Sequence, residues 1–403
     1  MSCSSSETSV RPRKLRVSGW QFPALRGGLF SLGAPLLLTL FCGSATAAPA
    51  PINTQFDDQD ILVTLPEPAL TTTTPPADPN RLADLIQAQI QQARSTGDPR
   101  FTGYAEGLLQ QWNGQMTDRL RVLKATIDQS NHRFEQARNG LTDLIGSNTD
   151  PQQAIQARLM LANIELVQGR YDAAAEHCNE LTQRLPGLIA ASCQAQAQAR
   201  TGQPVAAYQQ LKQQFANAGN ATETARIWAL GTLGDLAAQL DNPAAKTYWL
   251  ALLSADPDDL YTRAQLADWY LARGEVNQVL SVTEGYETVD SLAVIRAIAL
   301  EQAGHPDAGA LKATLTQRFA EAQWRGNLLH KRDFARFQLD LADKPESALE
   351  NAQENWADQR EPSDTRLLLR AAISTGNTDQ IASVKTWLSQ NGQQDARYPE
   401  INP

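Results

Sequence analysis

Few residues of this 403-residue sequence have the types and spacing that enzyme chemistry or metal binding requires. The four histidines are far apart, so no two of them would share a helix face; they are His132, His177, His305 and His330. His177 stands next to Cys178, but consecutive helical residues point in different directions, which disfavours a shared metal ion. No Gly-rich phosphate loop, GxSxG motif or HExxH motif occurs. The sequence therefore predicts a protein that is not an enzyme, with no catalytic residues, no metal and no cofactor.

The first 47 residues have the pattern of an export signal. Basic residues up to Arg26 precede an apolar run at 29–43, and the small residues of 45–47 suit a signal peptidase. The apolar run is shorter than the roughly 20 residues of a membrane span. We therefore expect a cleaved signal peptide over 1–47 and a periplasmic mature chain with no transmembrane segment. The alternative is an uncleaved N-terminal anchor.

Two cysteines lie beyond the expected signal, Cys178 and Cys193, which is an even number in an oxidising compartment. Each would lie about two helical turns from a bend near Pro186 and Gly187. Two antiparallel helices could then bring their Cα atoms within the roughly 7 Å that a bridge requires. A disulfide is one interpretation of the pair, and two buried thiols are the other.

The composition and the hydrophobic pattern of the sequence change at residue 80. Residues 48–79 are rich in Pro and Thr without hydrophobic periodicity, so we expect a linker there. From 80 to 391, helical blocks alternate with breaks such as 95–99 and 147–151, in which Asp or Ser stands where it would cap a helix. No strand pattern follows the linker, and we expect 392–403 to be a tail.

One stretch of the helical region has a regular spacing of small and large residues. It reads Arg158-x2-Leu161-Ala162-x2-Glu165, then Gly169 at a turn, then Ala174-x3-Cys178 and Pro186. This resembles the W-x2-L-G-x2-Y, A-x3-F and P positions of the tetratricopeptide repeat. Similar turns recur along the chain, at 130–141, Gly202, the block from Ala229 to Pro257, Gly274, Gly304, 341–352 and Gly376.

The resemblance to the tetratricopeptide family implies an all-α fold. We expect a right-handed superhelical solenoid of about eight tetratricopeptide-like helix pairs over residues 80–391. Small residues such as Ala162 and Ala267 would let the first helix of a pair approach the second. The segment 354–372 is also similar to part of exported repeat proteins of Gram-negative bacteria, so the resemblance is to an exported bacterial protein of this type.

In tetratricopeptide solenoids the first helix of each pair faces the inner groove. The spacing from the small residues of each first helix indicates which side chains would face this groove. The candidate partner-binding residues are Arg119, Asn163, Gln196, Tyr261, Asp268, His330, Asp333 and Arg370. The alternative is a solvated polar face without a partner. The mixed signs of these residues argue against a simple clamp for a terminal carboxylate, which would need several Lys or Arg together.

The charge of the chain disfavours nucleic acid as a partner. The formal net charge is −9, and the basic residues of 1–47 make the rest of the chain more acidic still. Phosphate binding requires clustered Lys and Arg. The sequence therefore favours a non-enzymatic scaffold in the bacterial periplasm that binds a protein or peptide. The alternative is a structural accessory subunit of a cell-envelope enzyme or transport complex.

Overall fold

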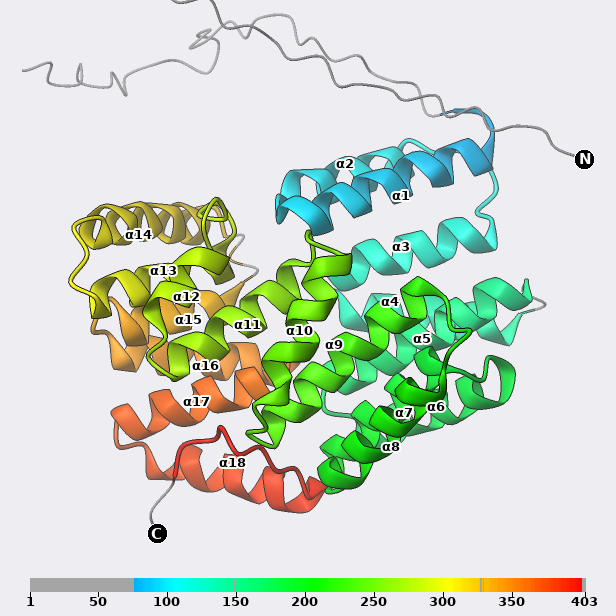
Figure 1. The fold of residues 1–403 in the computed structure, drawn as a ribbon. Coiled ribbons are helices and arrows are strands. Elements are labelled where there is room, and N and C mark those ends of the chain that lie inside the picture. Colours follow the sequence, from blue (N-terminus) through cyan, green and yellow to red (C-terminus); the bar gives the residue numbers. More distant parts are fainter. Residues whose placement is uncertain (1–75, 148–149, 327, 329, 401–403) are drawn as a thin grey trace, which may run out of the picture. The chain divides into compact units, whose positions relative to one another are not determined.

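The computed structural model describes residues 76–147, 150–326, 328 and 330–400. The expected signal peptide (1–47) and all but the last residues of the expected linker (48–79) lie outside these ranges. The described residues are helical and contain no strand (Figure 1). The helices are α1 (Pro79–Thr96), α2 (Pro99–Gln110), α3 (Asp118–Ser130), α4 (Phe134–Gly146), α5 (Pro151–Val167), α6 (Tyr171–Arg184), α7 (Leu188–Arg200), α8 (Pro204–Asn217), α9 (Glu223–Gln239), α10 (Ala244–Ala255), α11 (Leu260–Ala272), α12 (Val276–Val282), α13 (Asp290–Gln302), α14 (Ala308–Trp324), α15 (Lys331–Asp340), α16 (Pro345–Asp358), α17 (Pro362–Ser374) and α18 (Thr378–Asn391).

Each odd-numbered helix packs against the even-numbered helix that follows it. The prediction of an all-α solenoid of tetratricopeptide-like helix pairs is confirmed. The described ranges hold nine pairs, whereas the sequence pattern led us to expect about eight. The additional pair is α1 with α2, because the break at 95–99 joins two helices of one pair at Gly97, where the backbone is left-handed (φ 69°).

Acidic side chains begin several of the helices, as the sequence predicts. Asp98 and Asp150 accept hydrogen bonds from amides in the first turns of α2 and α5, and Asp259 does so for α11. Such caps satisfy amides that have no partner within the helix. The helix boundaries are thus set locally, which fixes the length of each pair.

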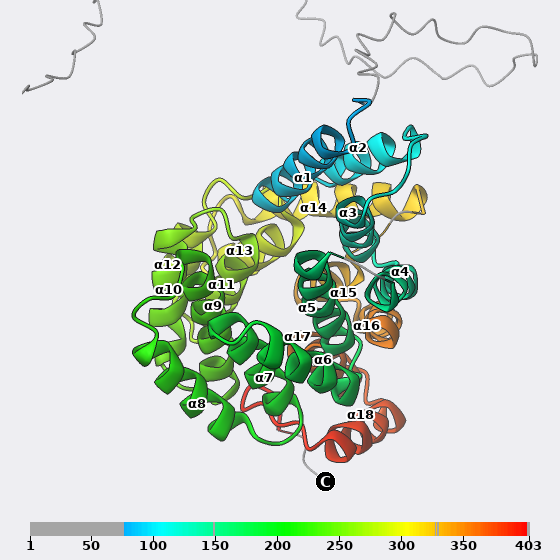
Figure 2. The same cartoon turned by 90° about the vertical axis from the view of Figure 1, so that its right-hand side faces the viewer.

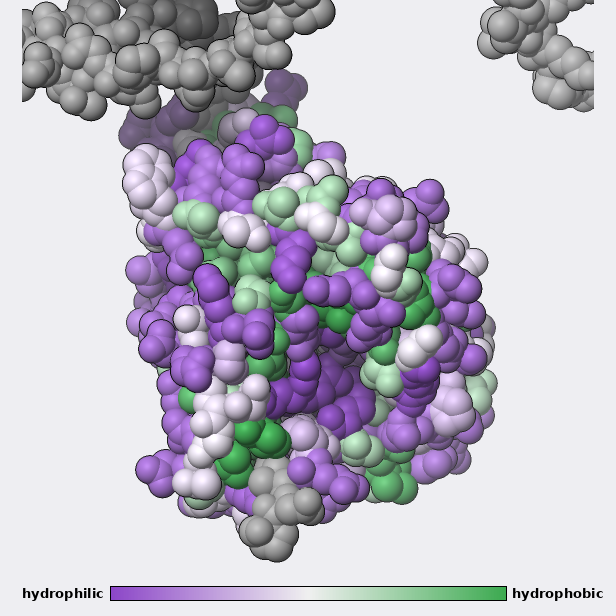
Figure 3. Space-filling model, turned by 90° about the vertical axis from the view of Figure 1, so that its left-hand side faces the viewer, coloured by the Kyte–Doolittle hydropathy of each residue, from purple (hydrophilic) through white to green (hydrophobic). Residues whose placement is uncertain are grey.

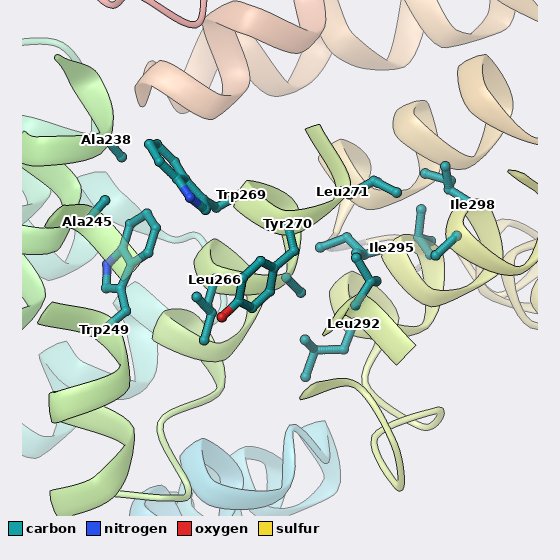
Figure 4. Packing of buried hydrophobic residues seen from close by; sticks show 14 of the residues in the cluster. Ala238, Ala245, Trp249, Leu266, Trp269, Tyr270, Leu271, Leu292, Ile295 and Ile298 are labelled. Atoms are coloured by element: carbon teal, nitrogen blue, oxygen red, sulfur yellow. The ribbon is translucent and has the colours of Figure 1, made fainter. Parts of the chain in front are cut away.

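Buried side chains from α7 to α15 form the largest core cluster. Trp249 of α10 and Trp269 of α11 meet edge to face with ring centroids 6.0 Å apart (Figure 4). Gly234 of α9 makes room for this packing, because a Cβ there would lie 2.3 Å from the indole nitrogen of Trp249. The core therefore runs continuously from one helix pair to the next, as it does in repeat proteins.

Cys178 of α6 and Cys193 of α7 form a disulfide in the structure, with their Cα atoms 5.4 Å apart. Both residues are buried in the cluster that joins these two helix pairs. The residue that replaces the aromatic side chain of the repeat template thus takes part in a covalent link between neighbouring pairs.

Helices far apart in the sequence also contact one another. The backbone N–H of Arg360, before α17, donates to the carbonyl of Val167 at the end of α5, at 2.6 Å. Next to this contact, Gly169 is left-handed (φ 73°), and a Cβ there would lie 3.0 Å from the side chains of Arg360 and Trp387. In Figures 1 and 2, the red segment at the end of α18 runs toward the green α7 and α8, and Gly392 lies against Gly202 of the turn between those helices. The solenoid therefore returns to its own earlier repeats.

None of the helices in the described ranges has both the length and the apolar character that crossing a membrane requires.

Candidate functional site

A charged groove of about 960 Å³ lies along the first helices of the last four pairs. It is lined mainly by residues of α11, α13, α15 and α17, with Asp241 from the α9–α10 turn and Ala396 and Arg397 of the segment that follows α18. Figure 3 looks onto the side of the unit where α13 to α17 lie and shows a hollow in which hydrophilic side chains gather. We call this feature the arginine–aspartate groove. Its charged lining residues are Arg273, Arg332, Arg336, Arg366, Arg370, Arg397, Asp241, Asp268, Glu301, Asp333 and Asp340.

Asp268 joins three helices at the floor of the groove. Its two carboxylate oxygens accept hydrogen bonds from Arg336 of α15 and Arg366 of α17. The three side chains are only 14–18% exposed, so their charges are poorly screened by water. Burial alone would disfavour the ionised carboxyl, but the two guanidinium groups hold the pKa of Asp268 well below its usual range.

A second ion pair continues this network along the same two helices. Arg370, one turn after Arg366, donates two hydrogen bonds to Asp340, one of them 3.2 Å long. Asp340 also lies 3.6 Å from Arg336. Since residues four apart share a helix face, α15 and α17 each direct a row of charges into the groove.

Arg332 anchors the other end of the α15 row. Its Nη1 lies 3.4 Å from carboxylate oxygens of both Glu361 and Asp364, and it donates to the Ser363 hydroxyl at 3.0 Å. Asp364 also accepts the N–H of Glu361 at 3.0 Å and so caps α17. The start of α17 and the arginine of the groove are therefore positioned by the same carboxylate.

At the rim, Arg273 combines two kinds of contact. Its guanidinium lies over the indole of Trp269, 3.2 Å from the ring centroid, and its Nη2 donates to Asp241. Cation–π packing of this kind orients the planar guanidinium. The rim thus presents a guanidinium that is oriented by the buried Trp269 and paired with Asp241.

Three of the eight residues predicted to bind a partner line the groove: Asp268, Asp333 and Arg370. The structure does not place Arg119 there. This residue of α3 pairs with Asp84 of α1 at 2.7 Å. Arg119 therefore joins the first two helix pairs to each other and does not contribute to the groove.

The remaining four predicted residues also lie outside the lining of the groove. Asn163 is exposed on α5, and Gln196 of α7 donates to the Thr232 hydroxyl of α9 at 3.3 Å. Tyr261, which is 47% exposed, donates to Asp235 at 3.1 Å. His330 lies before α15, with its Nδ1 3.8 Å from Asp290.

Asp235 and His330 have shifted pKa values for reasons that the structure makes clear. Low solvation raises the pKa of Asp235 to about 6, although Tyr261 and Trp249 donate hydrogen bonds to its carboxylate. The nearby Asp290 raises the pKa of His330. Within the described ranges, no three His, Cys, Asp or Glu side chains come together as metal ligands would.

Sequence reasoning missed most of the arginines of the groove. Arg332 and Arg336 precede Asp340 at spacings of four on α15, and Arg366 precedes Arg370 by four on α17. That spacing was a usable signal, since it extends the face on which Asp333 and Arg370 were already placed. Arg397 had no such signal, because its position depends on how residues 392–400 pack.

The described residues define a tetratricopeptide-like helical-repeat protein with a charged groove along the first helix of each of its last four pairs. No family model matches the sequence, and no curated protein matches it. The chain is similar to the solved structure of the Rap conjugation gene regulator of the plasmid pLS20 in complex with the Phr* peptide. The identity is 12%, the match covers 75% of this chain and 97% of that chain, and the TM-score is 0.40.

A second similar structure is the P58(IPK) TPR domain, with 13% identity, coverage of 77% of this chain and 89% of that chain, and a TM-score of 0.20. Similarities this remote add nothing to the fold assignment. The pairwise packing of the helices and the left-handed residues at their turns support it directly.

Proposed function

We propose that this protein is a non-enzymatic scaffold of the bacterial periplasm that binds a peptide segment of a protein partner in the arginine–aspartate groove. The observation that supports this most is the groove itself. Four consecutive first helices, α11, α13, α15 and α17, direct charged and polar side chains into one hollow. Its positive and negative groups alternate, which suits a polypeptide with charges of both signs better than a single anion.

The pairing of charges within the groove favours binding over catalysis. Asp268 is held by two arginines that keep its pKa well below its usual range, so it is not a proton donor near neutral pH. Asp340 is likewise paired with two arginines, Arg336 and Arg370. The perturbed Asp235 lies outside the lining and accepts hydrogen bonds from Tyr261 and Trp249. Each of these acids has a structural partner that accounts for its position.

The proposal of a periplasmic location is supported by the sequence of residues 1–47, which lie outside the described ranges. Fractionation of cells that express the full chain, with N-terminal sequencing of the exported product, tests it. We expect a mature protein that begins at Ala48. An intact N-terminus in the membrane fraction would indicate the uncleaved anchor instead.

The groove proposal is tested by partner capture with two matched tryptophan variants. Gln265 lines the groove on α11, and Gln317 is exposed on α14, outside the lining. The residues 48–403, with Gln265→Trp or Gln317→Trp, are used as bait against periplasmic and solubilised envelope extracts. We expect a partner to be recovered with the wild-type chain and with Gln317→Trp but not with Gln265→Trp.

Equal recovery with both variants would argue for the accessory-subunit alternative, in which the groove has no ligand. Circular dichroism and a thermal melt of each variant show that the bait is folded. The same substitution type at both sites ensures that a loss of binding reports the position and not the tryptophan.

A further inference from the structure

The segment after α18 passes close to an earlier turn of the chain. α18 ends at Asn391 and is followed by Gly392, where the backbone is left-handed (φ 65°). Gly392 lies against Gly202 of the α7–α8 turn, and a Cβ on Gly202 would come within 3.3 Å of the carbonyl oxygen of Gly392. Because neither residue has a side chain, the segment reaches the end of α9 directly.

Gln239, the last residue of α9, holds this segment through its backbone. The carbonyl of Gln239 accepts the N–H of Ala396 at 2.9 Å, and its side-chain amide donates to the carbonyl of Gln394 at 2.5 Å. The last carbonyls of a helix have no acceptor role within the helix, so this one is available to a peptide. Both contacts are to main-chain atoms, which any extended peptide possesses.

The Gln239 amide is fixed for this role by its surroundings. Gln239 is 2% exposed, and its Nε2 also donates to the carbonyl of Ala199 in α7, at 3.1 Å. A side chain that is already ordered loses little conformational entropy when a peptide binds to it. The amide therefore behaves as a preorganised donor next to Ala396, which lines the groove.

The charged residues of the segment neutralise each other. Asp395 accepts hydrogen bonds from the backbone N–H and the Nε of Arg397, both 2.9 Å long, and from its Nη2 at 2.7 Å. Arg397 and Ala396 line the groove. The segment thus forms part of the groove wall without adding net charge to the network around Asp268.

The match between this segment and its surroundings is incomplete. The Oε1 of Gln239 and the hydroxyl of Tyr398 are buried and have no hydrogen-bond partner among the residues that the structure describes. A buried polar atom without a partner costs free energy. A peptide that donates to the Gln239 Oε1 would therefore be bound better than the chain's own segment.

We propose that the surface around Gln239 is a peptide-binding subsite of the groove, and that residues 393–398 are its internal occupant. An extended peptide segment of the partner displaces them and takes over the two main-chain contacts. The displacement by a partner rests on the proposed function, whereas the subsite can be tested without any partner.

The test uses a fluorescein-labelled peptide of residues 393–400 and fluorescence anisotropy. It compares the chain 48–403 with a variant that ends at Gly392. In the full chain the tethered segment competes at an effective concentration in the millimolar range. We expect the shortened variant to bind the peptide at least tenfold more tightly than the full chain does.

Two substitutions in the shortened variant identify the contact. Gln239→Met keeps the length of the side chain and removes the amide, so we expect at least a tenfold loss of peptide affinity. Gln317→Met on α14 is the matched control and should leave affinity unchanged. Failure of the folded shortened variant to bind the peptide, or equal binding by Gln239→Met, would overturn the proposal.

A second measurement, made on the full chain, tests the proposal even if the shortened variant does not fold. Amide hydrogen exchange at Ala396 should be faster than at buried helical amides such as that of Leu233, because the segment opens without global unfolding. Equal exchange rates at the two amides would refute displacement. If the shortened variant binds the peptide but the capture experiment recovers no partner, the subsite is supported and only the proposed function is overturned.

Discussion

Asp268→Asn removes the charge that holds Arg336 and Arg366 together at the floor of the groove. Removing one partner of a buried ion pair costs about 3–5 kcal/mol, because the other charge stays buried and unpaired. The side chains here are 14–18% exposed, and asparagine keeps one acceptor oxygen. Arg336 also retains Asp340 at 3.6 Å. We therefore expect a loss of about 2 kcal/mol of unfolding free energy, which is below the range for a fully buried pair because the side chains are partly exposed and partly compensated.

Thermal unfolding followed by circular dichroism measures this loss. A destabilisation of that size lowers Tm by about 3 °C in a domain of this length. The control is Asp258→Asn, since Asp258 is exposed in the α10–α11 loop and has no ion pair in the described structure. The control variant should melt within about 1 °C of the wild type, as surface changes usually do.

The pH dependence of the difference follows from the lowered pKa of Asp268. An acid with a lower pKa in the folded state stabilises the protein above its unfolded value, near 4, and loses this effect as the pH falls. The gap in Tm between wild type and Asp268→Asn should be constant from about pH 5 to 8 and should narrow below about pH 4.

A double variant separates the loss of attraction from the cost of an unpaired charge. If Arg366 is unpaired in Asp268→Asn, then adding Arg366→Met should recover part of the lost stability. Equal melting of wild type and Asp268→Asn, or a further loss in the double variant, would refute the view that this network is held by Asp268.

Three further predictions follow from buried groups elsewhere. The pKa of Asp235 is raised to about 6 in the folded protein. Its contribution to stability is therefore present below the pKa of the unfolded state, near 4, and is lost as the pH rises through 6. Thermal melts at pH 4 and pH 7 should show a larger fall in Tm for the wild type than for Asp235→Asn. Gly234→Ala crowds the indole packed against it and should cost about 1–3 kcal/mol in denaturant unfolding, whereas Gly140→Ala, with open space at its Cβ position, should not destabilise. The Cys178–Cys193 bridge closes a loop with a sequence separation of 15, so its reduction should cost about 3 kcal/mol. Mass spectrometry of the exported protein with and without reductant checks the bond itself, and two free thiols would contradict it.

The fold could be predicted because its determinants are local. Turn glycines such as Gly169 and capping residues such as Asp150 act within a few residues of their own position. The α1–α2 pair was missed as a repeat because its turn glycine, Gly97, lies 14 residues after Ala83, whereas Gly169 lies 7 residues after Ala162. Local signals thus give the helices and most of their pairing.

The site was predictable only in part, because the groove is a product of tertiary packing. Asp268 was found from its phase within α11, but its partners Arg336 and Arg366 lie on other helices. Which arginine meets it depends on how α11, α15 and α17 stack. The contribution of Arg397 depends on a contact with Gln239 that no periodicity reports.

The contacts between distant repeats have a consequence for how the protein unfolds. In an open solenoid each repeat touches only its neighbours, so the ends melt first and the centre last. Here the Tyr171 hydroxyl donates to the carbonyl of Arg360 at 3.4 Å across 189 residues, and the ring of Tyr171 also packs against Trp387 of α18. Unfolding of the last pair, α17 and α18, therefore also removes contacts made by α5 and α6. The terminal repeats and the middle of the chain share one cooperative unit, and fraying from the last helix is suppressed.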